Sequence, residues 1–194
     1  FKHVGIFPEQ AVNWDFLFQK LSILKKQLPA PPKVLNLFAY TGLASVVSRT
    51  AGAEVTHLDS IKQVVTWARE NMEASGLDGI RWMVEDALKF VQREVRRGNQ
   101  YQCLILDPPA YGRGPDGEKW ILEEHLPQLL EACAQILDPE NGIFVLNLYS
   151  LGFSTLITEN LMKEYFPKKE AELGEIYLED SFRKKLPLGT FARF

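Results

Sequence analysis

Three short runs of almost uninterrupted apolar residues constrain the fold of this chain more than any other feature of its sequence. They occupy residues 34–38, 103–106 and 143–146. Runs of this length are typical of buried strands, because a buried helix would be longer and a half-exposed strand would alternate apolar with polar residues. Strands that are buried on both faces occur mainly in parallel sheets covered by helices on both sides. The sequence therefore predicts a sheet of this kind.

Segments with helical spacing of their apolar residues lie between the predicted strands. The helices are expected at residues 13–28, 42–51, 61–75, 87–97, 118–137 and 154–165, with a potential kink at Pro127. The parallel strands are expected at residues 33–38, 54–58, 80–84, 101–106 and 142–149, and a Gly/Pro-rich loop follows the fourth of them. Two further strands, 173–179 and 187–194, have no helix between them and predict an antiparallel hairpin at one sheet edge. Repeated strand–helix units favour an α/β, doubly wound, Rossmann-like fold with a mostly parallel seven-stranded sheet.

Bulk properties of the chain exclude several classes of protein. With 194 residues, 46% of them hydrophobic and 24% charged, the chain is expected to form one globular domain with one core. Cys103 and Cys133 lie in apolar runs and predict buried thiols in a reducing compartment, the cytoplasm. No apolar run approaches the roughly 20 residues of a membrane helix, and a signal-peptide pattern is lacking. We therefore expect no membrane partner.

The charge of the chain does not by itself indicate a nucleic-acid partner. The formal net charge is -3 at pH 7, but basic residues gather in three local clusters. The clusters are Lys89, Arg93, Arg96 and Arg97; Lys163, Lys168 and Lys169; and Arg183, Lys184 and Lys185. Solvated surface is the simpler interpretation of each cluster, and contact with RNA phosphates is the alternative.

A ligand is expected at the carboxyl ends of the strands in a sheet of this kind. The first strand is followed by the turn Phe38-Ala39-Tyr40-Thr41-Gly42, whose glycine allows a ligand to approach the backbone closely. The turn lacks the pattern G-x-G-x-x-G that a dinucleotide pyrophosphate needs at a helix N-terminus. NAD and FAD are therefore disfavoured as cofactors.

Acidic residues follow the next two predicted strands. Asp59, followed by Ser60, lies about 20 residues past the turn, where a carboxylate receives the ribose hydroxyls of an adenosine. Asp86, followed by Ala87, comes after the third strand and is placed to meet an adenine amino group. Each aspartate on its own also fits the cap of the helix that follows it. Together with the turn, the two aspartates indicate a site for an adenosine without phosphates.

The fourth predicted strand ends in Asp107-Pro108-Pro109-Ala110-Tyr111, the most informative segment of the chain. Two successive prolines fix the backbone and lack N–H groups. We expect a rigid projection whose carbonyl groups stay free to accept hydrogen bonds from a substrate amine. The Tyr111 ring just beyond is placed to stack on a base. An ordinary tight turn capped by the aspartate is the alternative.

These motifs resemble, in order and spacing, those of class I S-adenosylmethionine (SAM)-dependent methyltransferases, specifically the group typified by bacterial large-subunit ribosomal RNA methyltransferases. Residues 2–10 resemble a segment of that group that precedes the core and folds over the cofactor. Residues 1–32 are therefore expected to cover the cofactor site, and residues 33–194 to form the methyltransferase domain. The resemblance implies that residues 38–42 hold the methionine part of SAM, Asp59 the ribose and Asp86 the adenine. It adds cofactor contacts at Gln10, Ser60, Ala87 and Asp107.

Two departures from the pattern of this group bear on the reaction. Relatives that methylate cytosine C5 would carry a cysteine nucleophile where this chain has Asn147-Leu148-Tyr149-Ser150-Leu151-Gly152. Cys103 and Cys133 lie within a strand and a helix and are poor nucleophiles, so this activity is disfavoured. Within the segment, Tyr149 and Ser150 either line the pocket or only pack. Ala11 stands where the group tends to have arginine, so contacts at the cofactor or substrate entry are expected to differ.

The resulting hypothesis is direct in-line transfer of a methyl group from SAM to a base in RNA, with ribosomal RNA implied by the resemblance. Asp107 and the Pro108 carbonyl are expected to orient the acceptor amine, and Pro109 and Tyr111 to complete the acceptor site. Positioning of this kind is worth roughly 7 to 11 kcal/mol. Methylation of a protein or small molecule, and SAM binding without catalysis, are the alternatives. The oligomeric state stays open.

Four conspicuous side chains receive a structural interpretation. Trp14 and Phe18 are expected in the core, because they lie on the apolar stripe of the first predicted helix. His57 and His125 lack the neighbouring ligands of a metal site, so no metal is expected.

Overall fold

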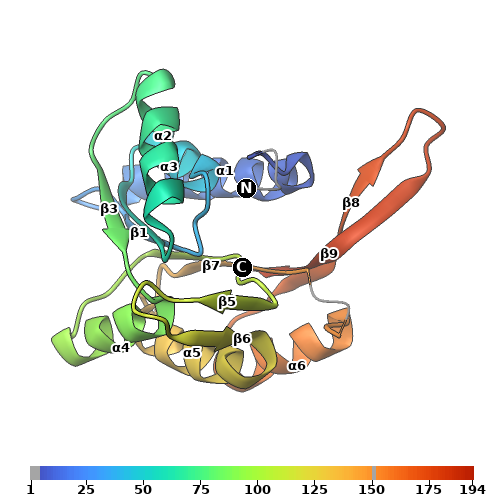
Figure 1. Ribbon diagram of the computed structural model, residues 1–194. Coiled ribbons are helices and arrows are strands. Elements are labelled where there is room, and N and C mark those ends of the chain that lie inside the picture. The colour runs from blue at the N-terminus through green and yellow to red at the C-terminus, as the bar shows by residue number, and fades with distance from the viewer. Residues whose placement is uncertain (1–4, 150–151) are drawn as a thin grey trace.

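The computed structural model describes residues 5–149 and 152–194 as one mixed sheet with helices on both faces (Figure 1). Across the sheet the strands occur in the order β3-β2-β1-β4-β7-β9-β8. The bounds are β1 Lys33–Leu37, β2 Glu54–Asp59, β3 Ile80–Val84, β4 Cys103–Leu106, β7 Ile143–Leu148, β8 Glu172–Glu179 and β9 Lys185–Arg193. The first five pair in parallel, β9 runs antiparallel to β7, and β8 runs antiparallel to β9 at the edge. The predicted α/β doubly wound fold with its antiparallel C-terminal hairpin is confirmed.

The helices divide between the two faces of the sheet, as Figure 1 shows. One face carries α1 Ala11–Gln27, α2 Leu43–Thr50 and α3 Lys62–Ala74, and the other carries α4 Ala87–Arg97, α5 Leu122–Ile136 and α6 Thr155–Tyr165. A short 3-10 helix, η1 Pro8–Gln10, precedes α1. Each face has its own apolar core, and β4 and β7 are buried along their whole length between the two cores. This burial explains why the central strands are continuous apolar runs.

The segment after β4 differs from the prediction of a loop followed by a helix from residue 118. It forms a second, two-stranded sheet of β5 Tyr111–Arg113 and β6 Lys119–Ile121, and α5 begins only at Leu122. The cause is Trp120. Its Nε1 donates to the Pro109 carbonyl at 2.7 Å, and the centroid of its ring lies 4.8 Å from that of Phe38. These tertiary contacts outweigh the local helical pattern.

Expectations about three single residues also need correction. Tyr101, predicted as the first residue of the fourth strand, lies outside β4 and forms only an isolated bridge with Leu137. Phe18, predicted in the core, is 44% exposed because α1 turns it away from the sheet. Trp14 is partly buried and lines a cavity described below, so it is not a simple core residue either.

Membrane spans and metal clusters are absent from the part of the chain that the structure describes. No helix there combines the length and the apolar character needed to cross a membrane. No three side chains of His, Cys, Asp or Glu gather there in a group able to hold a metal ion.

The core at the C-terminal half of the sheet predicts the effect of one substitution. Phe144 of β7 is fully buried. The centroid of its ring lies 4.6 Å from that of Phe166 and 5.5 Å from that of Phe194. Phe144→Ala is expected to lower the free energy of unfolding by about 3 to 5 kcal/mol, because it leaves a cavity among aromatic rings. Phe18→Ala, on the exposed side of α1, is the control and is expected to cost below about 1 kcal/mol. Urea unfolding measures both, and equal losses would contradict the assignment of the core.

Candidate functional site

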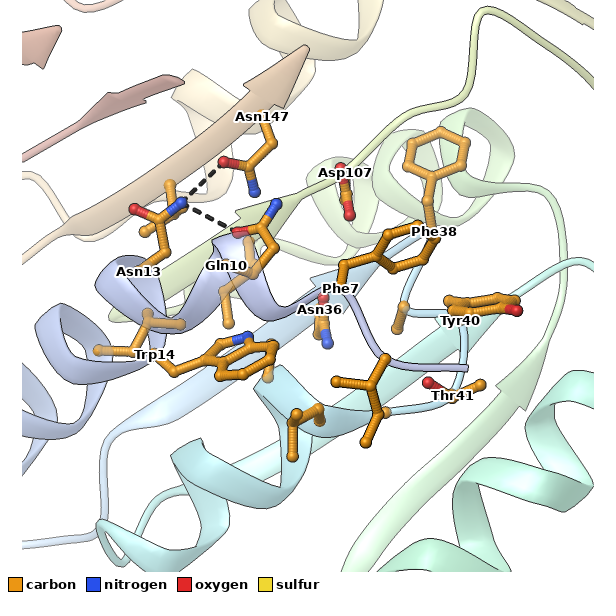
Figure 2. A pocket seen from close by; sticks show the side chains of 18 of the residues that line it. Phe7, Gln10, Asn13, Trp14, Asn36, Phe38, Tyr40, Thr41, Asp107 and Asn147 are labelled. Carbon is orange, nitrogen blue, oxygen red and sulfur yellow. Dashed lines mark hydrogen bonds between the residues drawn. The ribbon is translucent and has the colours of Figure 1, made fainter. Parts of the chain in front are cut away.

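Strand order reverses between β1 and β4, and a cavity of about 60 Å³ lies beyond their carboxyl ends. Figure 2 shows side chains from several elements pointing into this first cavity. They come from the segment before α1, from α1 itself, from the turn after β1 and from the ends of β4 and β7: Phe7, Gln10, Asn13, Trp14, Asn36, Phe38, Ala39, Tyr40, Thr41, Gly42, Asp107 and Asn147. The predicted cofactor turn, Gln10 and Asp107 therefore lie around one cavity.

The turn after β1 is held in an unusual conformation. Phe38, Tyr40 and Gly42 have positive φ angles of 54°, 46° and 87°. The Ala39 N–H donates to the Leu58 carbonyl at 3.0 Å, and the Tyr40 N–H donates to the Asp59 carboxylate at 3.0 Å. A Cβ on Gly42 would lie 2.9 Å from that of Ala68, so only glycine fits there. The turn is thus a strained, over-determined element, as turns at functional sites often are.

Asp59, predicted to hold the ribose, is the residue that fixes this turn. Its Oδ2 accepts from the Tyr40 N–H and its Oδ1 accepts from the Ile61 N–H, each at 3.0 Å. Burial raises the pKa of the Asp59 carboxyl, while the N–H groups of Ile61, Tyr40 and Ser60 oppose that rise. A carboxylate oxygen accepts more than one hydrogen bond, so both oxygens keep capacity for hydroxyl groups of a ligand.

A second cavity of about 30 Å³ adjoins the first, and Phe38 lines both. The remaining predicted cofactor residues, Asp59, Ser60, Asp86 and Ala87, gather around it. Its outer wall is the β5–β6 hairpin with Gly112, Arg113 and Trp120. The residues predicted for the methionine part and those predicted for the adenosine part therefore lie around two cavities that share Phe38.

Asp86 has the capping role that was the alternative interpretation of this residue. Its Oδ1 accepts from the Lys89 N–H at 2.9 Å and begins α4. The neighbouring Glu85 is engaged by both Nη atoms of Arg93, at 2.5 and 2.7 Å. Asp86 caps the helix and also lines the second cavity, so the two interpretations coexist.

Asp107 is the least compensated polar group of the site. Its Oδ1 is buried and has no hydrogen-bond partner among the described residues. Burial, together with the charge of the nearby Glu9, raises the pKa of Asp107 to about 7. Glu9 is itself only 7% exposed. Two carboxyl groups are thus held in a confined space where a donor or a positive charge from a ligand would stabilise them.

A hydrogen-bonded relay fixes the opposite wall of the first cavity (Figure 2). Arg193 of β9 donates from Nη1 to Oδ1 of Asn13 at 3.0 Å. A guanidinium cannot accept, so Nδ2 of Asn13 faces Oδ1 of Asn147 at 2.8 Å and Oε1 of Gln10 at 3.0 Å. Nε2 of Gln10 in turn donates to the Tyr149 hydroxyl at 2.7 Å. The relay uses Oδ1 of Asn147, and Figure 2 shows its Nδ2 on the side of the cavity.

The first cavity has no basic side chain among its described lining residues. Its polar groups are the Asp107 carboxyl, the amides of Gln10, Asn13, Asn36 and Asn147, and hydroxyl groups of the turn. A phosphate would find no counter-charge in such a cavity, whereas a cation would find the Asp107 carboxylate and aromatic faces.

The rest of the predicted acceptor motif lies at the rim. Pro109 lines the second cavity, and Pro108 and Tyr111 line neither cavity. Tyr111 is 72% exposed on β5. The expectation that both proline carbonyls stay free was wrong for Pro109, because the Trp120 indole occupies that carbonyl.

The histidines and cysteines take structural places. Nδ1 of His57 lies 3.1 Å from the Ser45 hydroxyl, and burial lowers the pKa of His57 to about 3, so the ring is neutral. His125 uses Nδ1 for the backbone of Ile121. Cys103 and Cys133 are buried, and burial raises the pKa of both thiols. Neither cysteine is a thiolate nucleophile in this structure.

Three asparagines of the site were not predicted from the sequence: Asn13, Asn36 and Asn147. Asn36 interrupts the apolar run of β1 and donates to the Ser45 hydroxyl at 2.9 Å, and Asn147 interrupts that of β7. A lone amide inside a buried strand is costly unless it is paired, which is the signal that points to such residues. Tyr149, left open between pocket and packing, contacts Gln10 at the cavity, whereas Ser150 and residues 2–4 lie outside the described residues.

Comparisons with known proteins agree on a family and a fold. The model of the family described as conserved hypothetical protein 95 matches residues 18–143. The ribosomal RNA large subunit methyltransferase K/L of Shewanella frigidimarina is 30% identical over 118 residues, 59% of this chain and 16% of that protein. The chain spans between 16% and 44% of the length of the curated relatives that it matches.

Two solved structures illustrate the similarity. The crystal structure of the SAM-dependent methyltransferase from Agrobacterium tumefaciens is 42% identical with a TM-score of 0.92, and the match covers 100% of this chain and 64% of that one. The structure of SMU.776 complexed with SAH is 23% identical with a TM-score of 0.73, over 97% of this chain and 50% of that one. At that lower identity the second match shows a shared fold.

The Asp107 carboxyl predicts how stability depends on pH. Its pKa is raised from 3.8 to about 7 on folding, so between these values the folded protein keeps a proton that the unfolded chain has lost. The free energy of unfolding is therefore expected to fall as the pH rises from about 4 to about 7. Asp107→Asn removes this dependence. At pH 8 its free energy of unfolding is expected to exceed that of the wild type by up to about 4 kcal/mol.

Urea unfolding at pH 5 and pH 8 measures this difference. Asp15→Asn is the control, because it also removes one carboxylate but at an exposed position. Its free energy of unfolding is expected to depend on pH as that of the wild type does. Identical pH profiles for Asp107→Asn and the wild type would show that Asp107 ionises normally.

Proposed function

This chain belongs to the conserved hypothetical protein 95 family, and we propose that it is a SAM-dependent methyltransferase acting on a base in RNA, ribosomal RNA first. One observation carries the proposal. Two adjoining cavities share Phe38: one is lined by the Asp107 carboxyl and four amides without a basic side chain, and the other is lined by Asp59 and Asp86. This arrangement suits a ligand with a cationic amino-acid end and an uncharged nucleoside end.

The residues of the site fit SAM group by group. The ammonium and sulfonium charges would lie in the first cavity, near Asp107 and the turn Phe38 to Gly42, with Gln10 above them. The ribose hydroxyls would meet the remaining lone pairs of Asp59, and the adenine would lie by Ser60, Asp86 and Ala87. The SAH-bound structure of SMU.776 and the Agrobacterium methyltransferase support the assignment of the cofactor.

The mechanism assigned to the chain's own residues is positioning. SAM supplies a methyl group that is already activated by a sulfonium leaving group. Asp107 accepts a hydrogen bond from the acceptor amine and takes the proton that the amine releases, for which a pKa of about 7 is well matched. The amide of Asn147 donates to a carbonyl of the acceptor, held in orientation by Asn13. The buried walls exclude water.

RNA is proposed as the substrate because of the relatives. The curated relatives that match are named ribosomal RNA large subunit methyltransferases. A base in RNA reaches such a cavity only from a single strand or after flipping, and the exposed Tyr111 at the rim is proposed to stack on it. We also propose that residues 1–32 form the cover over the cofactor, and that the protein acts in the cytoplasm, where the free thiols of Cys103 and Cys133 persist.

Transfer of labelled methyl from SAM tests the proposal. Hypomethylated ribosomal RNA and a total protein extract are offered in parallel to the wild type and to Asp107→Ala. RNA labelling is expected from the wild type and at least about 100-fold less from the variant, because the acceptor loses its orienting partner. Because Asp107 also lines the proposed cofactor cavity, the SAM affinity of the variant is measured by calorimetry and methyl transfer is compared at saturating SAM.

Each other outcome contradicts a part of the proposal. Label in protein alone would identify a protein methyltransferase, and SAM binding without transfer to either pool would identify a binding module. A wild type that does not bind SAM would refute the function as a whole.

A further inference from the structure

The C-terminal hairpin extends beyond the sheet at the edge where the site lies. β9 pairs with β7 only between Thr190 and Arg193, opposite residues 145–148. Residues 185–189 continue with β8 alone. Because β9 is antiparallel to β7, this free part lies past the carboxyl end of β7, next to Tyr149. We define residues 177–187 as the arm, and Figure 1 shows it standing away from the body of the protein.

The arm exposes aromatic and basic side chains together. Phe182 at its tip is 82% exposed, more than any other large hydrophobic side chain among the described residues. Arg183, Lys184 and Lys185 follow it directly and are exposed. Nζ of Lys185 lies 4.3 Å from the centroid of the Tyr177 ring, so a cation and an aromatic face are already combined on one side of the hairpin.

The turn at the tip is rigid and internally satisfied. Oδ1 of Asp180 accepts from the N–H groups of Phe182 and Lys184, at 2.8 and 2.9 Å, and the Arg183 N–H donates to the Asp180 carbonyl at 3.0 Å. The Asp180 carboxylate is therefore used within the turn rather than for an ion pair. The side chains of Phe182 and Arg183 project from a preorganised loop.

Arg183 occupies a backbone position that favours glycine. Its φ is 62°, in the left-handed region, where a side chain is strained. An exposed arginine in such a conformation gains no packing that would offset the strain. A strained, exposed, charged residue at the tip of a projecting hairpin points to a function of the side chain itself.

Ion pairing differs between this tip and the other two basic clusters of the sequence, in each of which at least one cation is paired. Arg93 is paired with Glu85, Arg97 with the buried Glu94, and Lys89 with Glu118. Lys163 is paired with Glu159 in the second cluster. No ion pair among residues 5–149 and 152–194 includes Arg183, Lys184 or Lys185.

We propose that the arm binds the RNA strand beside the methylated base, with Phe182 stacked on an unpaired base and Arg183 and Lys184 on phosphates. This inference rests on the proposed function for its substrate. Stacking on an aromatic ring beside cations is how single-stranded nucleic acid is held, because every base offers a face and every nucleotide a phosphate. The position past the end of β7 places the arm beside the cavity that would hold the target base.

The test compares two arm variants of the full chain with matched controls. Phe182→Ala is expected to weaken binding of a single-stranded ribosomal RNA oligonucleotide about tenfold, with an unchanged salt dependence. Arg183→Gly is expected to weaken binding. The plot of log affinity against log salt concentration is expected to become less steep by about 0.7, because one phosphate contact is lost. Glycine also relieves the strained φ, so the Tm is expected to stay or rise. Fluorescence anisotropy without SAM measures the affinities.

Leu156→Ala and Lys62→Ser are the controls, since they remove an exposed apolar and an exposed basic side chain elsewhere. Both are expected to bind RNA as the wild type does. SAM affinity, measured separately, is expected to be unchanged in all four variants. Failure of the wild type to bind SAM would refute the proposed function. The RNA affinities of the arm variants, measured without SAM, would still test the role of the arm.

Three results would overturn the proposal for the arm. One is wild-type RNA affinity in both arm variants, which would leave RNA methylation by the wild type standing. Another is an affinity loss equal to that of the controls. The third is unchanged RNA affinity together with a shift from dimer to monomer in sedimentation, which would make a second copy of this chain the occupant of the arm.

Discussion

The Asp59 carboxylate connects the two turns on which the whole site is built. One oxygen binds the backbone of Tyr40 after β1, and the other binds that of Ile61 before α3. The turn after β1 contains two non-glycine residues in the left-handed region, each at a cost of about 1 to 3 kcal/mol, so it persists only while such bonds hold it. This conformation of the turn places the Phe38 ring in the lining of both cavities and in contact with the Trp120 ring.

The distribution of charge follows from that geometry. Inside the site, burial and the charge of Glu9 raise the pKa of Asp107, and the described residues that line the first cavity include no basic side chain to offset this. A cationic ligand in the first cavity would stabilise the ionised form of Asp107. Exposed basic side chains outside the ion pairs of the described residues also occur at the tip of the arm, at Arg183, Lys184 and Lys185.

Sequence reasoning reached the features that depend on local pattern. Buried parallel strands carry continuous apolar runs, and aspartates at their ends carry the motifs, so the sheet and the positions of Asp59 and Asp107 follow from the sequence. It missed features that depend on distant contacts. Trp120 forms a strand because it packs on Phe38 and binds Pro109, and periodicity carries no such information. The exposure of Phe18 depends on how α1 rests on the sheet.

The amide relay shows why the asparagines were hardest to predict and why they matter together. Asn13 and Asn147 are 134 positions apart, and Asn13 and Arg193 are 180 apart, so no local window contains the network. Arg193 also binds Glu172 of β8, which makes the root of the C-terminal hairpin part of the same network as the cavity wall. Charge-assisted bonds hold that root, and neutral amide bonds pass its orientation to Gln10 and Asn147. The root of the hairpin and the cavity wall therefore cannot shift independently without breaking buried hydrogen bonds.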